Sequence, residues 1–230
     1  MKVVPIIPAL NPDEKLITLV NELKKDFSKI IIVNDGSEKK DIFNKLEDFK
    51  ECIILTHEEN KGKGEALKTA FKYYLDNLEK NYLGVIAIDC DGQHLPKDAI
   101  GISKLLEKED KFILGTRLFN TKETPLRNKT GNRITSRVFK WLYGIYLKDT
   151  QTGLRATPNR LIKPLLEIEG SRFEYDLNVL IYLVKREEKI LEYDIKTVYL
   201  KNSNKKSNFR VFKDSYQIYK IMFKNRKKDQ

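Results

Sequence analysis

Two aspartates separated by one residue follow a short apolar run in the sequence. Asp89 and Asp91 come directly after residues 85–88, and Gln93 lies two positions further on. Two carboxylates with an amide oxygen are ligands that Mg²⁺ and Mn²⁺ prefer, and substrate phosphates commonly complete such sites. The spacing therefore predicts a Mg²⁺ or Mn²⁺ site at Asp89, Asp91 and Gln93. The alternative is an Asp-Gly turn whose carboxylates are solvated.

Further polar residues lie where other predicted strands end. Asp35 follows the apolar run at residues 30–33, and Arg117 follows the run at residues 112–115. In an open α/β sheet, ligands bind beyond the carboxyl ends of the strands. We therefore expect Asp35, Asp89 and Arg117 to meet at one edge of the sheet.

A glycine-rich segment at residues 60–64 has two interpretations. Its glycines, followed by a predicted helix, would let the backbone approach phosphate groups. It is not a Walker A motif, because Glu65 follows the second glycine, and it does not follow the first strand as a dinucleotide fingerprint does. It is equally a glycine-containing loop before a helix. His57 is expected to be structural, and Cys90 to be a small strand residue rather than a nucleophile.

Apolar runs typical of buried strands alternate with helical patterns, which predicts a parallel sheet with helices on both faces. The first helix is expected to begin with Asn11 as its cap and Pro12 in its first turn. Strands are expected at residues 3–7, 30–33, 52–55, 85–88 and 112–115. The second half is expected to hold an irregular stretch, two helices and a strand, at residues 118–130, 133–146, 176–185 and 193–199.

Composition excludes several classes of protein. The chain has 230 residues, 40% hydrophobic and 33% charged, which fits a soluble globular protein rather than a disordered one. No apolar run approaches the roughly 18 residues of a membrane span, and the N-terminus does not resemble a signal peptide. Cys52 and Cys90 show no pairing pattern, so we expect a reducing cytoplasmic location.

The positive charge is concentrated at the C-terminus. The net charge is +11, and residues 201–230 hold ten Lys or Arg against two Asp, which leaves +3 for residues 1–200. This division predicts a nearly neutral domain at 1–200 and a basic tail at 201–230. A neutral body argues against a nucleic-acid-binding fold, whereas a basic tail favours contact with an anionic surface.

The tail also has helical periodicity, which allows two interpretations. Four aromatic residues share one predicted helix stripe beside a stripe of lysines, so the helix either docks on the body or lies on an anionic membrane. The aromatic residues are Phe212, Tyr216, Tyr219 and Phe223, and the lysines are Lys213, Lys220, Lys224 and Lys227.

Five motifs occur in the order found in family 2 glycosyltransferases. They are Val33-Asn34-Asp35-Gly36-Ser37, Asn60-Lys61-Gly62-Lys63-Gly64, Asp89-Cys90-Asp91-Gly92-Gln93-His94, Gly115-Thr116-Arg117 and Asp149-Thr150-Gln151-Thr152-Gly153. The set most resembles the dolichol-phosphate-mannose-synthase-like branch, and the tail is similar to that of bacterial members. Leu10 and Pro12 depart from the family pattern, which has Tyr and Glu there. Many relatives continue into transmembrane helices, and this chain is expected to have none.

The resemblance implies a GT-A fold and transfer of a sugar, with inversion, from a nucleotide diphosphate sugar. A UDP-sugar is favoured over a GDP-sugar, and the expected acceptor is a polyprenyl phosphate or a cell-surface glycan precursor. The expected location is cytoplasmic, either free or peripheral on the inner face of the membrane. No nucleic-acid partner is implied.

The same resemblance assigns roles to individual residues. Asp35 would hold the base or ribose, Lys63 would neutralise donor phosphate, and Asp89, Asp91 and Gln93 would bind the metal. The full nucleotide-sugar-binding set is Pro8, Ala9, Asn11, Asp35, Lys63, Asp89, Cys90, Asp91, Arg127, Ser207 and Arg210. The expected catalytic set is Arg117, Asp149, Gln151 and Glu174.

Two questions stay open from the sequence. A lipid phosphate acceptor needs no general base, whereas a hydroxyl acceptor would need a carboxylate such as Asp149 or Glu174. The alternatives to sugar transfer are a nucleotidyltransferase, which normally has a glycine-rich loop after its first strand, and a nucleic-acid-binding module, for which the tail lacks a motif. A D-x-D phosphatase would carry its aspartates after the first strand.

Overall fold

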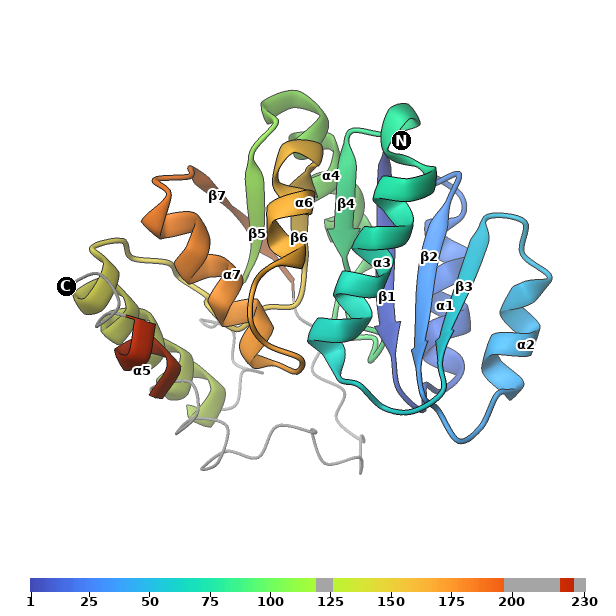
Figure 1. Ribbon diagram of the computed structural model, residues 1–230, viewed down its shortest axis with the longest axis horizontal. Helices are drawn as coiled ribbons and strands as arrows, with labels where there is room; N and C mark the ends of the chain where they lie inside the picture. The colour runs from blue at the N-terminus through green and yellow to red at the C-terminus, as the bar shows by residue number, and fades with distance from the viewer. Residues whose placement is uncertain (119–125, 197–219, 226–230) are drawn as a thin grey trace.

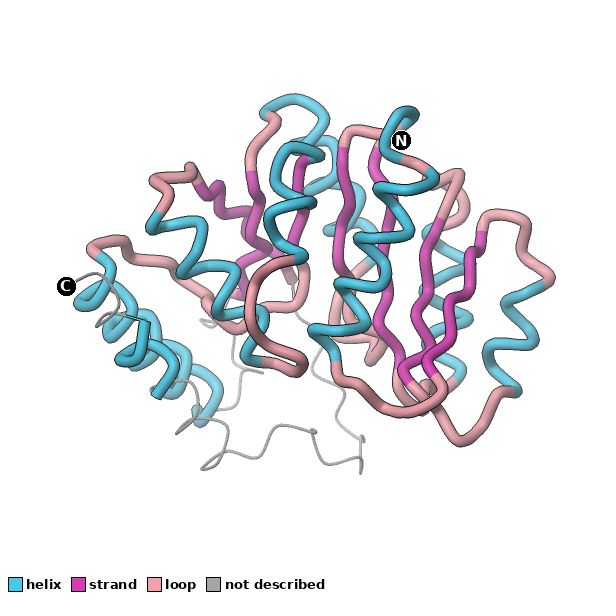
Figure 2. Tube along the Cα trace, viewed as in Figure 1, coloured by secondary structure: helices cyan, strands magenta, loops and turns pink. Residues whose placement is uncertain are grey.

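The computed structural model describes residues 1–118, 126–196 and 220–225, with side chains omitted at 126–130. Among these described residues, seven strands form one sheet in the order β3-β2-β1-β4-β6-β5-β7 (Figures 1 and 2). They are β1 (Val3–Ala9), β2 (Ile30–Asp35), β3 (Cys52–His57), β4 (Gly84–Ala87), β5 (Phe112–Arg117), β6 (Arg155–Pro158) and β7 (Ile190–Ile195).

Helices cover both faces of this sheet, as the continuous apolar strands predict. Figure 1 shows α3, α6 and α7 in front of the sheet and α1 and α4 behind it. Successive residues of each central strand enter opposite cores: Val4 and Ile6 pack in one, Val3 and Ile7 in the other. The helices are α1 (Glu14–Leu23), α2 (Asp41–Glu47), α3 (Lys63–Asn77), α4 (Pro96–Glu109), α5 (Leu126–Tyr143), α6 (Asn159–Leu166) and α7 (Glu174–Lys185), with a short 3₁₀ turn, η1 (Glu79–Asn81).

The sheet is mainly parallel, but β6 runs antiparallel between β4 and β5. Neither β6 nor α6 was predicted from the sequence. Strand β6 is four residues long, contains Arg155 and Pro158, and has no apolar alternation, although all four residues are buried. Its place between two strands therefore depends on partners distant in sequence rather than on a local pattern.

Three predicted boundaries also change. Asp13, not Asn11, caps α1: its carboxylate accepts from the Lys15 amide, while Asn11 has a left-handed φ of 47°. Helix α5 begins at Leu126, inside the stretch that was expected to be irregular. Strand β7 begins at Ile190, before its predicted start at residue 193.

The described part of the C-terminal tail is helical at residues 220–225 and docks on the body. Met222 is fully buried in the core that also contains Phe139 of α5. Phe223 is half-exposed and meets Trp141 edge-on, with ring centroids 6.2 Å apart. Phe212, Tyr216 and Tyr219 lie outside the described residues, as does most of the range 201–230, so the domain boundary stays a prediction. In the described parts of the chain, no helix is both long enough and apolar enough to cross a membrane.

Candidate active site

The predicted catalytic and ligand-binding residues lie where the parallel strands end, at the lower edge of the sheet in Figure 1. Asp35 is the last residue of β2, Arg117 the last of β5, and Asp89 follows β4. Lys63 is the first residue of α3. The expectation that strand ends gather these side chains at one edge agrees with this arrangement.

A largely buried ion network lies at the centre of this edge. The Lys63 Nζ atom is 2.7 Å from Asp89 Oδ1 and 3.0 Å from Asp176 Oδ2, with only 13% of the Lys63 side chain exposed. Burial alone would lower the pKa of Lys63, but the charges of Asp176 and Asp89 raise it above its ordinary value. Burial likewise opposes ionisation of Asp89, yet Lys63 and His94 hold its pKa well below its usual range. The lysine and the carboxylate are therefore both charged at neutral pH.

Asp176 was not singled out from the sequence. It lies in the first turn of α7, where an acidic residue is ordinarily explained by the helix dipole. Arg155, buried in the unpredicted strand β6, places Nη1 3.6 Å from Asp176 Oδ1 and donates to the Asp176 carbonyl. Only the tertiary structure shows that Asp176 shares Lys63 with the predicted metal ligand Asp89.

Gly153 packs directly against Asp89 and was also missed as a site residue. A Cβ atom at Gly153 would overlap the Asp89 carboxylate, including Oδ1 at 2.6 Å. The sequence shows this glycine within the motif at residues 149–153 but offers no sign of what it contacts. The absent side chain gives Asp89 the room for its present orientation.

We expect Gly153→Ala to reduce sugar transfer by roughly a hundredfold, because a displacement of about 1 Å in a reacting group can cost that much. The measurements are the transfer rate and the affinity for Mn²⁺ in the presence of UDP. Gly131→Ala is the matched control, since a Cβ there meets no atom within 4 Å. Unchanged rate and metal affinity in Gly153→Ala would show that Asp89 tolerates the methyl group.

Among the other residues of the acidic motif, His94 contacts Asp89 and Asp91 contacts Gln93. His94 is buried and places Nε2 3.3 Å from Asp89 Oδ2, while its Nδ1 has no hydrogen-bond partner among the described residues. Asp91 is exposed, and its Oδ1 accepts from the Gln93 amide at 2.9 Å. Partial desolvation and the charge of Asp89 raise the pKa of Asp91. Burial and both aspartates raise the pKa of Cys90 to about 12, so its thiol stays protonated, which fits a small structural residue.

The oxygen atoms of the acidic motif suit a divalent metal that takes its remaining ligands from a substrate. Within the described ranges, no three His, Cys, Asp or Glu residues are grouped so that they could hold a metal by themselves. In the predicted site, Asp89 and Asp91 would supply two carboxylates, and Gln93 would add an amide oxygen. Mg²⁺ is typically bound by one or two carboxylates plus phosphate and water oxygens, so this set suits a phosphate-completed site.

Asp35 anchors the glycine-rich segment. Its Oδ1 accepts from the Lys61 amide at 2.9 Å and lies 2.7 Å from His57 Nδ1, and its Oδ2 accepts from the Gly62 amide at 2.8 Å. His57 is buried and also reaches Thr69 Oγ1 at 2.9 Å, as expected for a structural histidine. A contact between Asp35 and the nucleotide stays a prediction.

The absence of side chains at Gly62 and Gly64 lets this segment pack closely against the loop before α7. A Cβ at Gly62 would overlap the Ser171 carbonyl, and one at Gly64 would lie 2.8 Å from the Gly170 oxygen. The Glu65 amide donates to Ser171 at 3.2 Å, and Glu174 Oε1 accepts from the Ser171 amide at 3.1 Å. Because the amides of Lys61, Gly62 and Glu65 already donate to protein acceptors, these three support a structural loop rather than a phosphate cradle, and phosphate contact by the Lys63 side chain stays a prediction.

Near the predicted nucleotide pocket, Asn11 joins the loops after β1 and β2. Its amide donates to Ser37 Oγ at 2.8 Å, and its Oδ1 accepts from the Glu38 amide at 3.0 Å. Pro8 and Ala9 form the end of β1 beside these loops. These residues are therefore brought together with Asp35, although their contact with a nucleotide stays a prediction.

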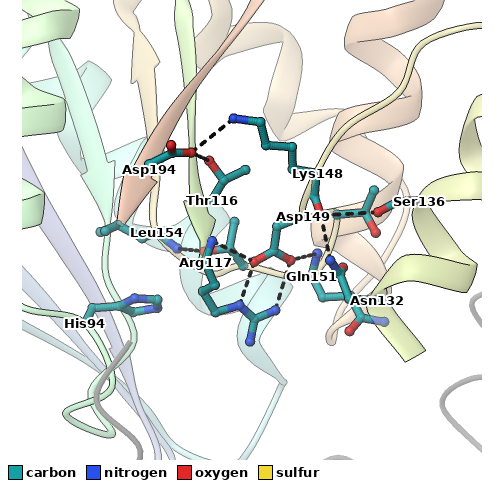
Figure 3. Close-up of polar contacts among 12 residues, drawn as sticks. His94, Thr116, Arg117, Asn132, Ser136, Lys148, Asp149, Gln151, Leu154 and Asp194 are labelled. Carbon is teal, nitrogen blue, oxygen red and sulfur yellow. Dashed lines mark hydrogen bonds and ion pairs between the residues drawn. The ribbon is translucent and has the colours of Figure 1, made fainter. Parts of the chain in front are cut away.

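On the other side of the site, buried Asp149 accepts two hydrogen bonds from the Arg117 side chain and a third from its backbone amide (Figure 3). Arg117 Nε donates to Asp149 Oδ2 at 2.6 Å and Nη2 to Oδ1 at 2.9 Å, and the Gln151 amide also donates to Oδ1 at 3.0 Å. This paired geometry fixes the plane of the guanidinium. Asp149 therefore orients Arg117 in the structure.

Helix α5 holds the backbone next to Asp149 through the carbonyl of Lys148. Asn132 Nδ2 donates to the Lys148 carbonyl at 2.6 Å, and Ser136 Oγ does so at 3.4 Å (Figure 3). Both side chains are buried on the inner side of α5. Three further predicted residues are not placed: Arg127 lies in α5 without a described side chain, and Ser207 and Arg210 lie outside the described residues.

The fold resembles that of a solved glycosyltransferase. Glucosyl-3-phosphoglycerate synthase from Mycobacterium tuberculosis, in complex with Mn²⁺, UDP and glucosyl-3-phosphoglycerate, superposes with a TM-score of 0.72 at 14% identity, covering 98% of this chain and 79% of the other. The same enzyme in complex with Mg²⁺ and UDP gives a TM-score of 0.72 at 15% identity. At these identities the likeness establishes the fold, which is GT-A-like.

Sequence comparisons establish the family. The profile of glycosyl transferase family 2 matches residues 6–164. UDP-N-acetylglucosamine–dolichyl-phosphate N-acetylglucosaminyltransferase from Methanococcus voltae is 34% identical over 223 residues, covering 86% of both chains. Glycosyltransferase AglJ from Haloferax volcanii is 23% identical over 177 residues, covering 76% of this chain and 56% of the relative. The chain therefore belongs to glycosyl transferase family 2, in its dolichyl-phosphate-sugar-transferase-like branch, and is a glycosyltransferase.

Proposed function

We propose that this glycosyltransferase moves N-acetylglucosamine from UDP-N-acetylglucosamine to a polyprenyl phosphate, with Mg²⁺ or Mn²⁺ and with inversion at the anomeric carbon. The donor and acceptor classes follow from the Methanococcus relative, which is 34% identical over most of both chains. The use of a divalent metal with UDP follows from the bound groups of the structural neighbour. The carboxylates and lysine at the strand ends support both parts of the proposal.

The hydrogen bonds of the two candidate general bases, Asp149 and Glu174, are the observation that supports a phosphate acceptor. Both oxygens of Asp149 accept hydrogen bonds from Arg117, and Glu174 Oε1 accepts from the amides of Ser171 and Arg172. Asp149, with both oxygens occupied, is therefore not arranged to take a proton from a hydroxyl, and one of the two oxygens of Glu174 is occupied as well. A phosphate oxygen is already anionic near neutral pH and needs no base, so this arrangement supports a phosphate acceptor.

The charges divide the site into a donor side and an acceptor side. During transfer the bond between sugar and donor phosphate breaks, and the departing UDP gains negative charge. Lys63 would stabilise that charge together with a divalent metal held by Asp89, Asp91 and Gln93. Arg117, oriented by Asp149, would bind the acceptor phosphate through its planar guanidinium.

A polyprenyl phosphate acceptor places the reaction at a membrane surface. We therefore propose a peripheral location on the cytoplasmic face, with the basic tail at residues 201–230 near anionic headgroups. In this proposal Ser207 and Arg210 close over the phosphates, and Arg127 faces the sugar or acceptor. The predicted domain at residues 1–200 holds all the other proposed site residues.

The test is an acceptor and donor panel. We expect release of UDP and formation of an N-acetylglucosaminyl phosphate lipid when the protein is incubated with UDP-N-acetylglucosamine, Mn²⁺ and a detergent-dispersed polyprenyl phosphate. Mass spectrometry identifies the lipid product, and the corresponding polyprenol, which lacks the phosphate, is the matched control. Faster transfer to polyprenol would contradict the acceptor assignment, and faster transfer from GDP-mannose would contradict the donor assignment.

A further inference from the structure

Helix α5 presents an exposed face that combines apolar and basic residues. Its inner side packs through Phe139 into the core and against α7. On its outer side Ile134 and Trp141 are seven residues apart, and Ile145 continues the same stripe just beyond the helix end. These three side chains are 47%, 65% and 43% exposed, so a sizeable apolar strip faces outward.

A basic stripe lies next to the apolar one. Arg133, Arg137 and Lys140 follow at intervals of four and three residues, and all three are exposed. None of them forms an ion pair with another residue that the structure describes. The sequence of α5 contains five Lys or Arg and no Asp or Glu. The outer face therefore carries unbalanced positive charge beside exposed apolar side chains.

The described end of the tail enlarges this face. Figure 1 shows residues 220–225 lying along α5, where Tyr143 Oη donates to the Met222 carbonyl at 2.8 Å. Phe223 contacts Trp141, and Lys220 and Lys224 are exposed beside it, with Lys224 Nζ 3.9 Å from Glu169 Oε2. We call the combined surface of Ile134, Trp141, Ile145 and Phe223 with Arg133, Arg137, Lys140, Lys220 and Lys224 the α5 face.

We propose that the α5 face docks on an anionic lipid surface. Aromatic and aliphatic side chains beside lysines and arginines are typical of segments that lie in the membrane interface, where the cations meet anionic headgroups. A second copy of this chain is the other occupant to consider. A two-fold symmetric contact would bring the two basic stripes towards each other, so charge complementarity favours the membrane.

Docking here would place the acceptor side of the active site near the lipid. The inner side of α5 holds the Lys148 carbonyl through Asn132 and Ser136, next to the Asp149 that orients Arg117. One helix therefore connects the proposed membrane contact with the proposed phosphate-binding arginine. This consequence rests on the proposed polyprenyl phosphate acceptor, whereas the docking itself does not.

The test is sedimentation of the full chain with vesicles that contain no polyprenyl phosphate, so its outcome is independent of the acceptor. We expect binding to vesicles of phosphatidylglycerol and phosphatidylcholine at low salt, release at high salt, and no binding to phosphatidylcholine alone. Arg137→Glu/Lys140→Glu should weaken binding by at least about tenfold. Lys104→Glu/Lys108→Glu, the same charge change on exposed residues of α4, should weaken it much less.

A second pair of variants tests the apolar part. Trp141→Ala should weaken vesicle binding, whereas Leu83→Ala, which removes a 43% exposed side chain elsewhere, should not. Thermal melting of all four variants confirms that they fold. Equal binding by the two charge variants would assign any membrane contact to the rest of the tail. A dimer in sedimentation velocity that Trp141→Ala dissociates, without vesicle binding, would assign the α5 face to a second copy; either result overturns the proposal.

Discussion

Asp89→Asn is expected to lower the rate of sugar transfer by roughly a thousandfold while the sheet stays folded. Asparagine keeps the size of the side chain but removes the charge that the proposed metal site needs. Lys63 keeps its second carboxylate, Asp176, at 3.0 Å, so the buried ammonium is not left without a partner. Transfer is measured at saturating donor, and the affinity for Mn²⁺ is measured separately in the presence of UDP.

Asp76→Asn is the matched control for this variant, since it makes the same chemical change at an exposed position of α3 and should retain full activity. EDTA should abolish transfer by the unmodified protein, and added Mn²⁺ or Mg²⁺ should restore it. Full activity in EDTA, or normal Mn²⁺ affinity in Asp89→Asn, would remove Asp89 from the proposed metal site.

Lys63→Met is expected to lower both activity and stability. The substitution leaves Asp89 and Asp176 without the cation that lies between them, and breaking a buried ion pair from one side costs about 3 kcal/mol in the free energy of unfolding. Transfer should fall at least a hundredfold, because Lys63 is also the proposed partner of the donor phosphate. Chemical denaturation measures the stability and the lipid-product assay measures the activity.

A second substitution separates these two effects. Lys63→Met/Asp176→Asn removes one of the two carboxylates that lose this cation, so we expect it to recover part of the lost stability and none of the lost activity. Lys72→Met, at an exposed position of the same helix, is the matched control and should change neither. If Lys63→Met is as stable and as active as the unmodified protein, the ion network has neither of the roles assigned to it.

The sequence was sufficient to locate most of the sheet and the edge where the site lies. Strands such as β2, whose six residues are all buried, are apolar almost throughout because helices cover both of their faces. The carboxyl ends of parallel strands share one edge, so polar residues near the ends of such strands, including Asp89 and Arg117, could be grouped from the sequence alone.

What the sequence did not reveal depends on contacts between distant segments. Strand β6 is short and polar, and it is a strand because β4 and β5 supply hydrogen-bond partners on both sides. Asp176 looks like an ordinary acidic residue at a helix start, and Gly153 like an ordinary loop glycine. Their importance comes from Lys63 and Asp89 respectively, and no local pattern records those pairings.

The position of β6 also has a consequence for how the chain acquires its structure during synthesis. Strands β1 to β4 can pair among themselves as soon as they emerge, but β5 pairs only with β6 and β7, which both follow it in the chain. Residues 155–158 must therefore be synthesised before β5 can join the sheet. Contacts between segments so far apart in the sequence slow folding. Gly153 precedes this strand and packs against Asp89, and Arg155 lies in it and pairs with Asp176. These two contacts of the site therefore form in the same late step. An incomplete chain that ends before β6 would leave β4 as an open edge of the sheet and β5 as an unpaired apolar segment, and both are open to aggregation at this stage of synthesis.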